Sequence, residues 1–153
     1  MSHPFAFANQ SIYHGRILLA GWRAAIDQRS EPAGQVALAF APAVRKQLLD
    51  AYGWLLLAAC RLTQVPEQPP HSVNDLPPLP AGLVRPVEVD ACAALERDGW
   101  VAALKQPLTR ASLSSRPGQL ASDVGGIEFR HFEVWLYELE RLAALIADAI
   151  DES

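Results

Sequence analysis

The segment 129–150, near the C-terminus, constrains the fold of this chain more than any other. Apolar side chains recur there at spacings of three and four residues: Phe132, Trp135, Leu139, Leu142, Ile146 and Ala149. This spacing places them on one stripe of an α-helix. Because such a stripe must be buried against other helices, the segment predicts an all-α protein.

Composition predicts a globular chain without added covalent support. The chain has 153 residues, of which 50% are hydrophobic and 20% charged, so it is expected to form one helical domain over 1–153. A chain of this size buries a core without disulfides or metals. The formal net charge of −4 argues against a broad, non-specific grip on nucleic acid phosphates.

The two cysteines and the N-terminus predict a cytoplasmic protein. Cys60 and Cys92 lie in apolar helical stretches, which is typical of buried, reduced thiols. The N-terminus has no basic segment followed by a long apolar run, so no signal peptide is expected. The longest charge-free apolar run, 51–60, has about half the length that a membrane span requires. We therefore expect no membrane association.

Two long helices are expected in the first half of the chain. The first spans 9–28, with Asn9 as its N-cap. The second spans 35–63 and contains Pro42, which removes a backbone donor. Either this helix is kinked at Pro42, which we favour, or a short helix ends there and Pro42 begins the next one. From 51 to 60 the helix is apolar all round, which predicts the central helix of the domain.

The second half is expected to begin with an irregular crossover. Seven of the twelve prolines fall within 64–86. Proline lacks the donor that a helix needs, so this segment predicts a long Pro-rich connection between the second and third helices. A third helix over 87–97 and a further turn or two over 100–106 follow. Residues 107–126, rich in Ser, Gly, Thr and Arg, predict a flexible loop. With the helix over 129–150, the chain predicts an irregular four-helix bundle.

Four stretches also resemble a known family. They are Asn9-Gln10-Ser11-Ile12-Tyr13-His14-Gly15, the run from Leu48 to Leu56, the run from Leu95 to Trp100, and Trp135-Leu136 with its following helix. Their layout resembles an uncharacterised family of small all-helical gammaproteobacterial proteins that carries only a domain-of-unknown-function label. The resemblance implies a small, cytoplasmic, bacterial helical protein. It implies no activity, cofactor or catalytic residue.

Metal-site candidates are weak in this sequence. Glu128 and His131 form a Glu-x-x-His pair, the spacing that di-iron bundles use twice. None of the other three histidines has a glutamate three residues before it, so the second pair is missing. A zinc site built from His14, Cys60, Cys92 and His131 lacks the short paired spacing of such sites. We therefore predict no metal and no cofactor, with Glu128 favoured by the dipole at a helix start.

An interaction surface is the more informative hypothesis. Its candidate residues are Tyr13, Arg16, Arg23 and Trp54. Arg16 and Arg23 share a helix face, where Arg23 is expected to pair with Asp27 four residues on. Together with Arg45-Lys46 these arginines would form a basic patch. Trp54 lies in the helix that is apolar all round, which would expose a partner surface if the crossover failed to cover it.

Three function classes follow. The favoured one is protein–protein interaction, as a homodimer or an adaptor, because apolar helix surface exceeds what four helices readily bury. The second is a ligand- or metal-binding bundle, with or without catalysis, using a pocket near Tyr13, His14 and His131. The third is a nucleic-acid accessory protein acting through the arginine face. The chain has no phosphate-loop, dinucleotide or HExxH motif, so a non-enzymatic role is favoured.

Overall fold

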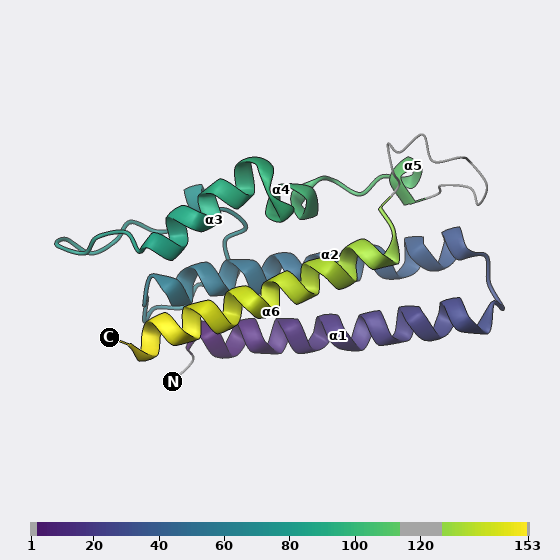
Figure 1. The fold of residues 1–153 in the computed structure, drawn as a ribbon, viewed down its shortest axis with the longest axis horizontal. Coiled ribbons are helices and arrows are strands. Elements are labelled where there is room, and N and C mark those ends of the chain that lie inside the picture. The colour runs from purple at the N-terminus through teal and green to yellow at the C-terminus, as the bar shows by residue number, and fades with distance from the viewer. Residues whose placement is uncertain (1–2, 114–126, 153) are drawn as a thin grey trace.

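A computed structural model describes residues 3–113 and 127–152, and all regular elements of these residues are helical (Figure 1). The α-helices are α1 (Pro4–Gln28), α2 (Ala33–Ala59), α3 (Val87–Asp98), α4 (Trp100–Lys105), α5 (Arg110–Leu113) and α6 (Phe129–Asp151). A single 3-10 turn, η1 (Val73–Asp75), interrupts the irregular segment between α2 and α3. The predicted all-α class is confirmed for this part of the chain.

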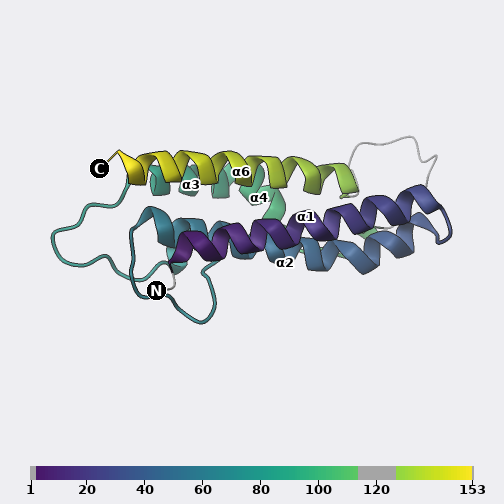
Figure 2. The same cartoon turned by 90° about the horizontal axis from the view of Figure 1, so that it is seen from below.

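Three long helices form the body of the molecule. α1 and α2 form an antiparallel hairpin, and α6 packs against both of them (Figures 1 and 2). α6 runs antiparallel to α1 and parallel to α2, which requires the long connection between α2 and α6. α3 and α4 lie across α2 and α6 on the side away from α1. The core is therefore centred on α2.

α1 begins earlier than the sequence analysis predicted. His3, not Asn9, is the N-cap, and its Nδ1 accepts a hydrogen bond of 3.1 Å from the backbone N–H of Phe5. Pro4 occupies the first turn, where its missing N–H is not needed. The expected cap at Asn9 is wrong because proline favours a helix start as strongly as asparagine does. The extra turns place Phe7 against the core.

α2 runs through Pro42 as one continuous helix, so the split alternative is wrong. It ends at Ala59, four residues before the predicted 63. Its end is a Schellman-type closure in which Arg61 has a positive φ of 56°. The N–H of Leu62 donates to the Leu57 carbonyl at 3.3 Å, and that of Arg61 donates to the Ala58 carbonyl at 3.0 Å. The sequence did not predict this helix end, because arginine occupies the position at which glycine is usual.

The apolar part of α2 is covered on every side. Every residue from Leu48 to Cys60 is buried, so its predicted central position is confirmed. The proline-rich segment lies directly on the helix at Gly53: a Cβ there would lie 1.7 Å from the carbonyl oxygen of Pro70. Glycine is required at this position because backbone occupies the place of a side chain. The segment therefore packs down on α2 and leaves no apolar patch there.

The short helices close the side opposite α1. Gly99 separates α3 from α4, close to the break that the sequence predicted. The predicted flexible loop over 107–126 contains α5, whose Leu113 is buried against the core. Thr109 and Ser112 fix this turn, since each backbone N–H donates to the other residue's hydroxyl, at 2.9 and 3.1 Å. The rest of that loop, 114–126, lies outside the described residues.

α6 spans Phe129–Asp151, close to the predicted 129–150. Five residues of its predicted stripe are buried, namely Phe132, Trp135, Leu139, Leu142 and Ile146, and Ala149 is half-buried. Trp22 of α1 joins the three long helices, because its ring lies 6.2 Å from that of Phe40 and 5.5 Å from that of Phe132. Among the described residues, no helix combines the length and hydropathy needed to cross a membrane.

Candidate functional site

Exposed apolar side chains lie on α1 and α6, the two helices that meet at one seam of the molecule. Tyr13 and Ile17 of α1 are 57% and 52% exposed, and Tyr137 of α6 is 61% exposed. We call the seam and the outward sides of its two helices the α1–α6 face. A groove of about 320 Å³ runs along it, lined by Arg16, Leu19, Ala20, Arg23, Phe129, Glu133, Leu136, Tyr137 and Glu140. Three of the four predicted interaction residues, Tyr13, Arg16 and Arg23, lie on this face.

Ion pairs cross the α1–α6 face at two levels. Arg16 Nη2 lies 3.2 Å from Glu140 Oε2, and Arg23 Nη2 lies 3.3 Å from Glu133 Oε1. The guanidinium of Arg23 also sits 4.5 Å from the centre of the Phe129 ring. The predicted pair between Arg23 and Asp27 is wrong, because α6 places a carboxylate directly opposite. Both arginines stand on α1 and both glutamates on α6, so the two sides of the groove have opposite charge.

Trp54, the fourth predicted interaction residue, is not on the surface. Its side chain is only 8% exposed. Phe7 stacks on the indole with ring centres 5.0 Å apart and planes at 30°. The prediction failed because α1 begins at Pro4, and its first turns carry Phe7 over Trp54.

The expected basic patch does not form as one surface. Arg16 and Arg23 reach α6, whereas Arg45 reaches the end of α4, on the other side of α2. Its Nε donates to the Leu104 carbonyl at 3.2 Å and its Nη2 to the Lys105 carbonyl at 2.8 Å. The arginine face proposed for nucleic acid is therefore divided, and its α1 half is neutralised by glutamates.

Glu128 and His131 close the start of α6. The backbone N–H of Glu128 donates to His131 Nδ1 at 2.8 Å, and the Glu128 carboxylate pairs with Arg130 Nε at 2.9 Å. The Glu128–His131 contact belongs to a capping box, so the Glu-x-x-His spacing serves helix capping here. Within residues 3–113 and 127–152, no group of three or more His, Cys, Asp or Glu side chains is arranged to hold a metal ion.

The ligand pocket suggested near Tyr13, His14 and His131 is not assembled. Because Arg23 faces Glu133 and Arg16 faces Glu140, His131 lies level with the end of α1 that is distant from His14. Eleven residues of helix, roughly 16 Å, separate the two levels. The zinc hypothesis fails for the same reason, since it needs both histidines in one site.

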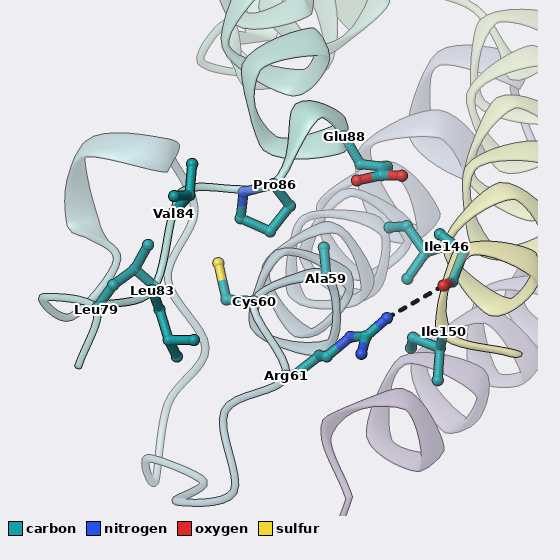
Figure 3. Close-up of a pocket in the computed structure, with 11 residues that line it drawn as sticks. Ala59, Cys60, Arg61, Leu79, Leu83, Val84, Pro86, Glu88, Ile146 and Ile150 are labelled. Carbon is teal, nitrogen blue, oxygen red and sulfur yellow. Dashed lines mark hydrogen bonds between the residues drawn. The ribbon is translucent and has the colours of Figure 1, made fainter. Parts of the chain in front are cut away.

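Both cysteines are free and buried, as predicted. Figure 3 shows Cys60 in a pocket of about 270 Å³ at the end of α2, among aliphatic side chains that include Leu83, Val84 and Ile146. Burial raises the pKa of Cys60, and it raises the pKa of Cys92 to about 11. A thiol that keeps its proton at neutral pH is a poor nucleophile. The two cysteines therefore act as core residues.

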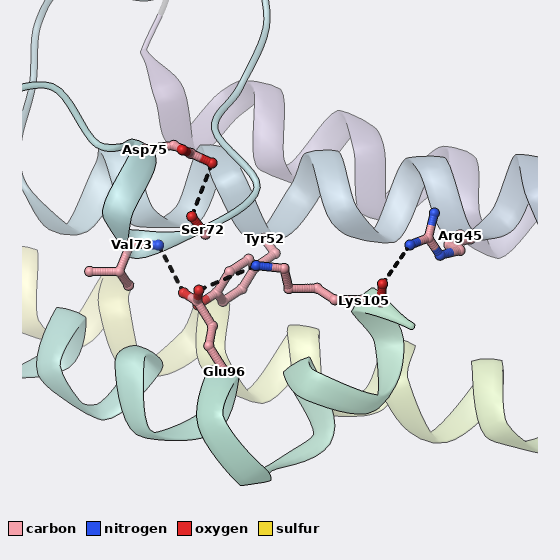
Figure 4. A network of polar contacts seen from close by, with 7 residues as sticks. All are labelled: Arg45, Tyr52, Ser72, Val73, Asp75, Glu96 and Lys105. Carbon is pink, nitrogen blue, oxygen red and sulfur yellow. Dashed lines mark hydrogen bonds and ion pairs between the residues drawn. The ribbon is translucent and has the colours of Figure 1, made fainter. Parts of the chain in front are cut away.

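A half-buried carboxylate, that of Glu96, joins four elements in a way that the sequence analysis missed (Figure 4). Glu96 Oε2 of α3 accepts hydrogen bonds from the Tyr52 hydroxyl at 2.6 Å and from the Val73 N–H at 2.9 Å. Lys105 Nζ of α4 approaches Glu96 Oε1 at 3.4 Å. The available signal was Tyr52 itself: a hydroxyl in an otherwise apolar stretch of helix needs a buried partner.

A second polar cluster lies beside it, around Asp50. This carboxylate is buried in α2, with Oδ2 at 2.6 Å from Lys46 Nζ and Oδ1 at 2.9 Å from His71 Nε2. The side chains of Arg45, Lys46, His71 and Lys105 line a pocket of about 220 Å³ together with Pro42 and Leu49. Three segments thus bring basic groups to one hollow.

Comparison with known proteins adds no assignment: no protein-family model, curated protein or solved structure matches the chain.

Proposed function

We propose that this protein acts by protein–protein contact through the α1–α6 face, and that its first partner is a second copy of itself. The observation that supports the proposal is the exposure of Tyr13 and Ile17 on α1 together with that of Tyr137, which lines the groove between α1 and α6. Clustered apolar side chains rimmed by charged ones are typical of interaction sites. Two tyrosines also provide large, amphipathic contact area of the kind that interfaces favour.

The charges on this face favour pairing with a second copy. A two-fold axis parallel to the helices would lay α1 of one copy over α6 of the other at the same level. Arg16 and Arg23 of one copy would then face Glu140 and Glu133 of the other, because the same residues already share levels within one chain. Such a face is self-complementary, which is the requirement for a symmetric dimer.

The same proposal includes the finer architecture. We treat α3 and α4, broken at Gly99, as the fourth helix of an irregular four-helix bundle, with 64–86 as its Pro-rich crossover. Placement in the bacterial cytoplasm, membership of the resembled gammaproteobacterial family and an adaptor role for other proteins are parts of this hypothesis. Two buried, protonated thiols support a reducing compartment.

Light scattering across a concentration series tests the proposal. The natural chain should be dimeric, and Ile17→Asp should shift it to monomer by placing a charge in the interface. Val84→Asp is the matched control, because Val84 is 88% exposed and lies outside the α1–α6 face. A monomer at high concentration, or equal effects of the two variants, would overturn self-association through this face.

A further inference from the structure

We propose that the pocket between α2, the proline-rich segment and α4 binds a tetrahedral oxyanion, either free phosphate or the phosphate group of a larger ligand. We call it the basic pocket; its charged lining is Arg45, Lys46, His71 and Lys105. This inference is independent of the α1–α6 face, from which α2 separates the pocket. Phosphate recognition in proteins relies on converging cationic donors of this kind.

Arg45 is held in the pocket by two hydrogen bonds to backbone carbonyls. Its Nε and Nη2 are fixed by the carbonyls of Leu104 and Lys105, at 3.2 and 2.8 Å. A guanidinium has five N–H donors in a rigid fork, so Arg45 keeps about three for a ligand. Because the two carbonyls hold the group in place, binding an anion would cost little side-chain entropy.

Asp50 orders the other side of the basic pocket. Each of its oxygens has one partner, Lys46 Nζ at 2.6 Å and His71 Nε2 at 2.9 Å. An ammonium has three donors, so Lys46 retains donors beyond the one that faces Asp50. His71 retains its second ring nitrogen, Nδ1. The buried carboxylate thus positions two basic groups instead of cancelling them.

The charge balance of the basic pocket favours an anion. Arg45, Lys46 and Lys105 supply three positive charges, and the carboxylates paired with the two lysines, Asp50 and Glu96, supply two negative ones. The remainder is one positive charge, in a chain whose net charge is −4. Lys105 Nζ is 3.4 Å from Glu96, a loose pair whose ammonium is available to a competing anion.

The size of the basic pocket limits what it can hold. Its volume of about 220 Å³ is below the range of roughly 300–1,000 Å³ that is usual for sites enclosing a whole organic ligand. Pro42 and Leu49 form its apolar walls. A phosphate group fits this space, and the rest of a larger ligand would extend into solvent.

Titration with inorganic phosphate, followed by amide chemical shifts, tests the proposal. We expect saturable shifts at residues around the basic pocket, and at least a five-fold weaker affinity in Lys46→Gln. Arg130→Gln is the control, since the Arg130 side chain is 75% exposed, pairs with Glu128 and does not line the basic pocket. A thermal melt of each variant shows whether it is folded, and phosphate should raise the midpoint of the natural chain more than that of Lys46→Gln.

A phosphorylated peptide and inorganic phosphate at equal concentrations then distinguish the two sources. Tighter binding of the peptide would identify a phosphate group on a larger ligand, and equal binding would identify the free ion; both support the pocket. Shifts that rise linearly without saturation, or equal losses in Lys46→Gln and Arg130→Gln, would overturn it.

Discussion

The covered part of α2 and the α1–α6 face contain similar apolar side chains, but those of α2 are buried and several on the α1–α6 face are exposed. α2 is apolar all round from 51 to 60, and neighbouring elements cover all of it. α6 is amphipathic, yet its outward side keeps Val134, Tyr137 and Leu145 more than half exposed. The apolar content of a helix therefore does not indicate where free surface remains. An apolar helix side is buried only where another segment of the chain packs against it.

The largest expected effect is the difference in stability lost when a buried and an exposed aromatic side chain of α6 are each truncated. Phe132→Ala should destabilise the fold by about 3–5 kcal/mol, because the ring is fully buried and its removal leaves a cavity in the core. Tyr137→Ala, five residues further along α6, should change the stability of the monomer by about 0.5 kcal/mol or less. Urea denaturation of both variants at concentrations where the chain is monomeric measures the contrast, and similar losses would mean that Tyr137 is not exposed in the monomer.

The next effect concerns the cover over α2. Gly53→Ala should cost about 1–3 kcal/mol or more, because the added Cβ meets the backbone of Pro70 and displaces the proline-rich segment. Gly34→Ala is the matched control in the same helix, since nothing lies within 4 Å of the added atom. It should be neutral or stabilising by up to about 1 kcal/mol. Denaturation midpoints that fall equally would contradict direct packing of this segment on Gly53.

Alkaline pH should lower the free energy of unfolding through buried groups of α2 and α3. Burial raises the pKa of Cys92 from 9.0 to about 11, and burial also raises the pKa of Tyr52. Between pH 9.0 and about pH 11 the Cys92 thiol loses its proton in the unfolded chain and keeps it in the folded one. Stability is therefore complete below pH 9 and falls, by about 2–3 kcal/mol from Cys92, as the pH rises to 11.

Urea unfolding at several pH values between 8 and 11 measures this loss. Cys92→Ala should remove the Cys92 part of the slope and leave the contributions of Cys60 and Tyr52. If the natural chain and the variant give parallel curves, the thiol does not titrate differently in the folded state.

The smallest effect lies on the α1–α6 face. A double-mutant cycle of Arg23→Ala and Glu133→Ala should give a coupling energy of about 0–1 kcal/mol, because both side chains are about half exposed. The coupling should fall as salt is added. A much larger coupling in a sample shown to be dimeric would indicate that a second copy buries the pair.

Helix positions were predictable where periodicity was strong. The apolar stripe of α6 predicted that helix, and the all-apolar run of α2 predicted its central position in the fold. The helix ends were not, because they depend on alternatives of similar energy: Pro4 competed with Asn9 as the start of α1. At the end of α2, Arg61 adopts a conformation that sequence patterns assign to glycine.

The sites were less predictable, because they depend on which segments meet. Tyr13, Arg16 and Arg23 follow one helix face, so their shared surface could be read from the sequence. Pairing of Arg23 with Glu133 could not, since it requires the direction and level of α6. The basic pocket combines residues from three segments with no common spacing, and only Arg45-Lys46 was visible beforehand.

Arg61 performs two separable tasks at the end of α2. Its backbone adopts the left-handed conformation that ends the helix, and its side chain donates to the carbonyl of Ala149 in α6 at 3.1 Å. A glycine at this position would keep the first task and abolish the second. The hydrogen bond from Arg61 thus holds the C-terminal turn of α6 against the end of α2. Because the left-handed backbone of Arg61 does not require a side chain, this hydrogen bond can be lost while α2 still ends at the same residue.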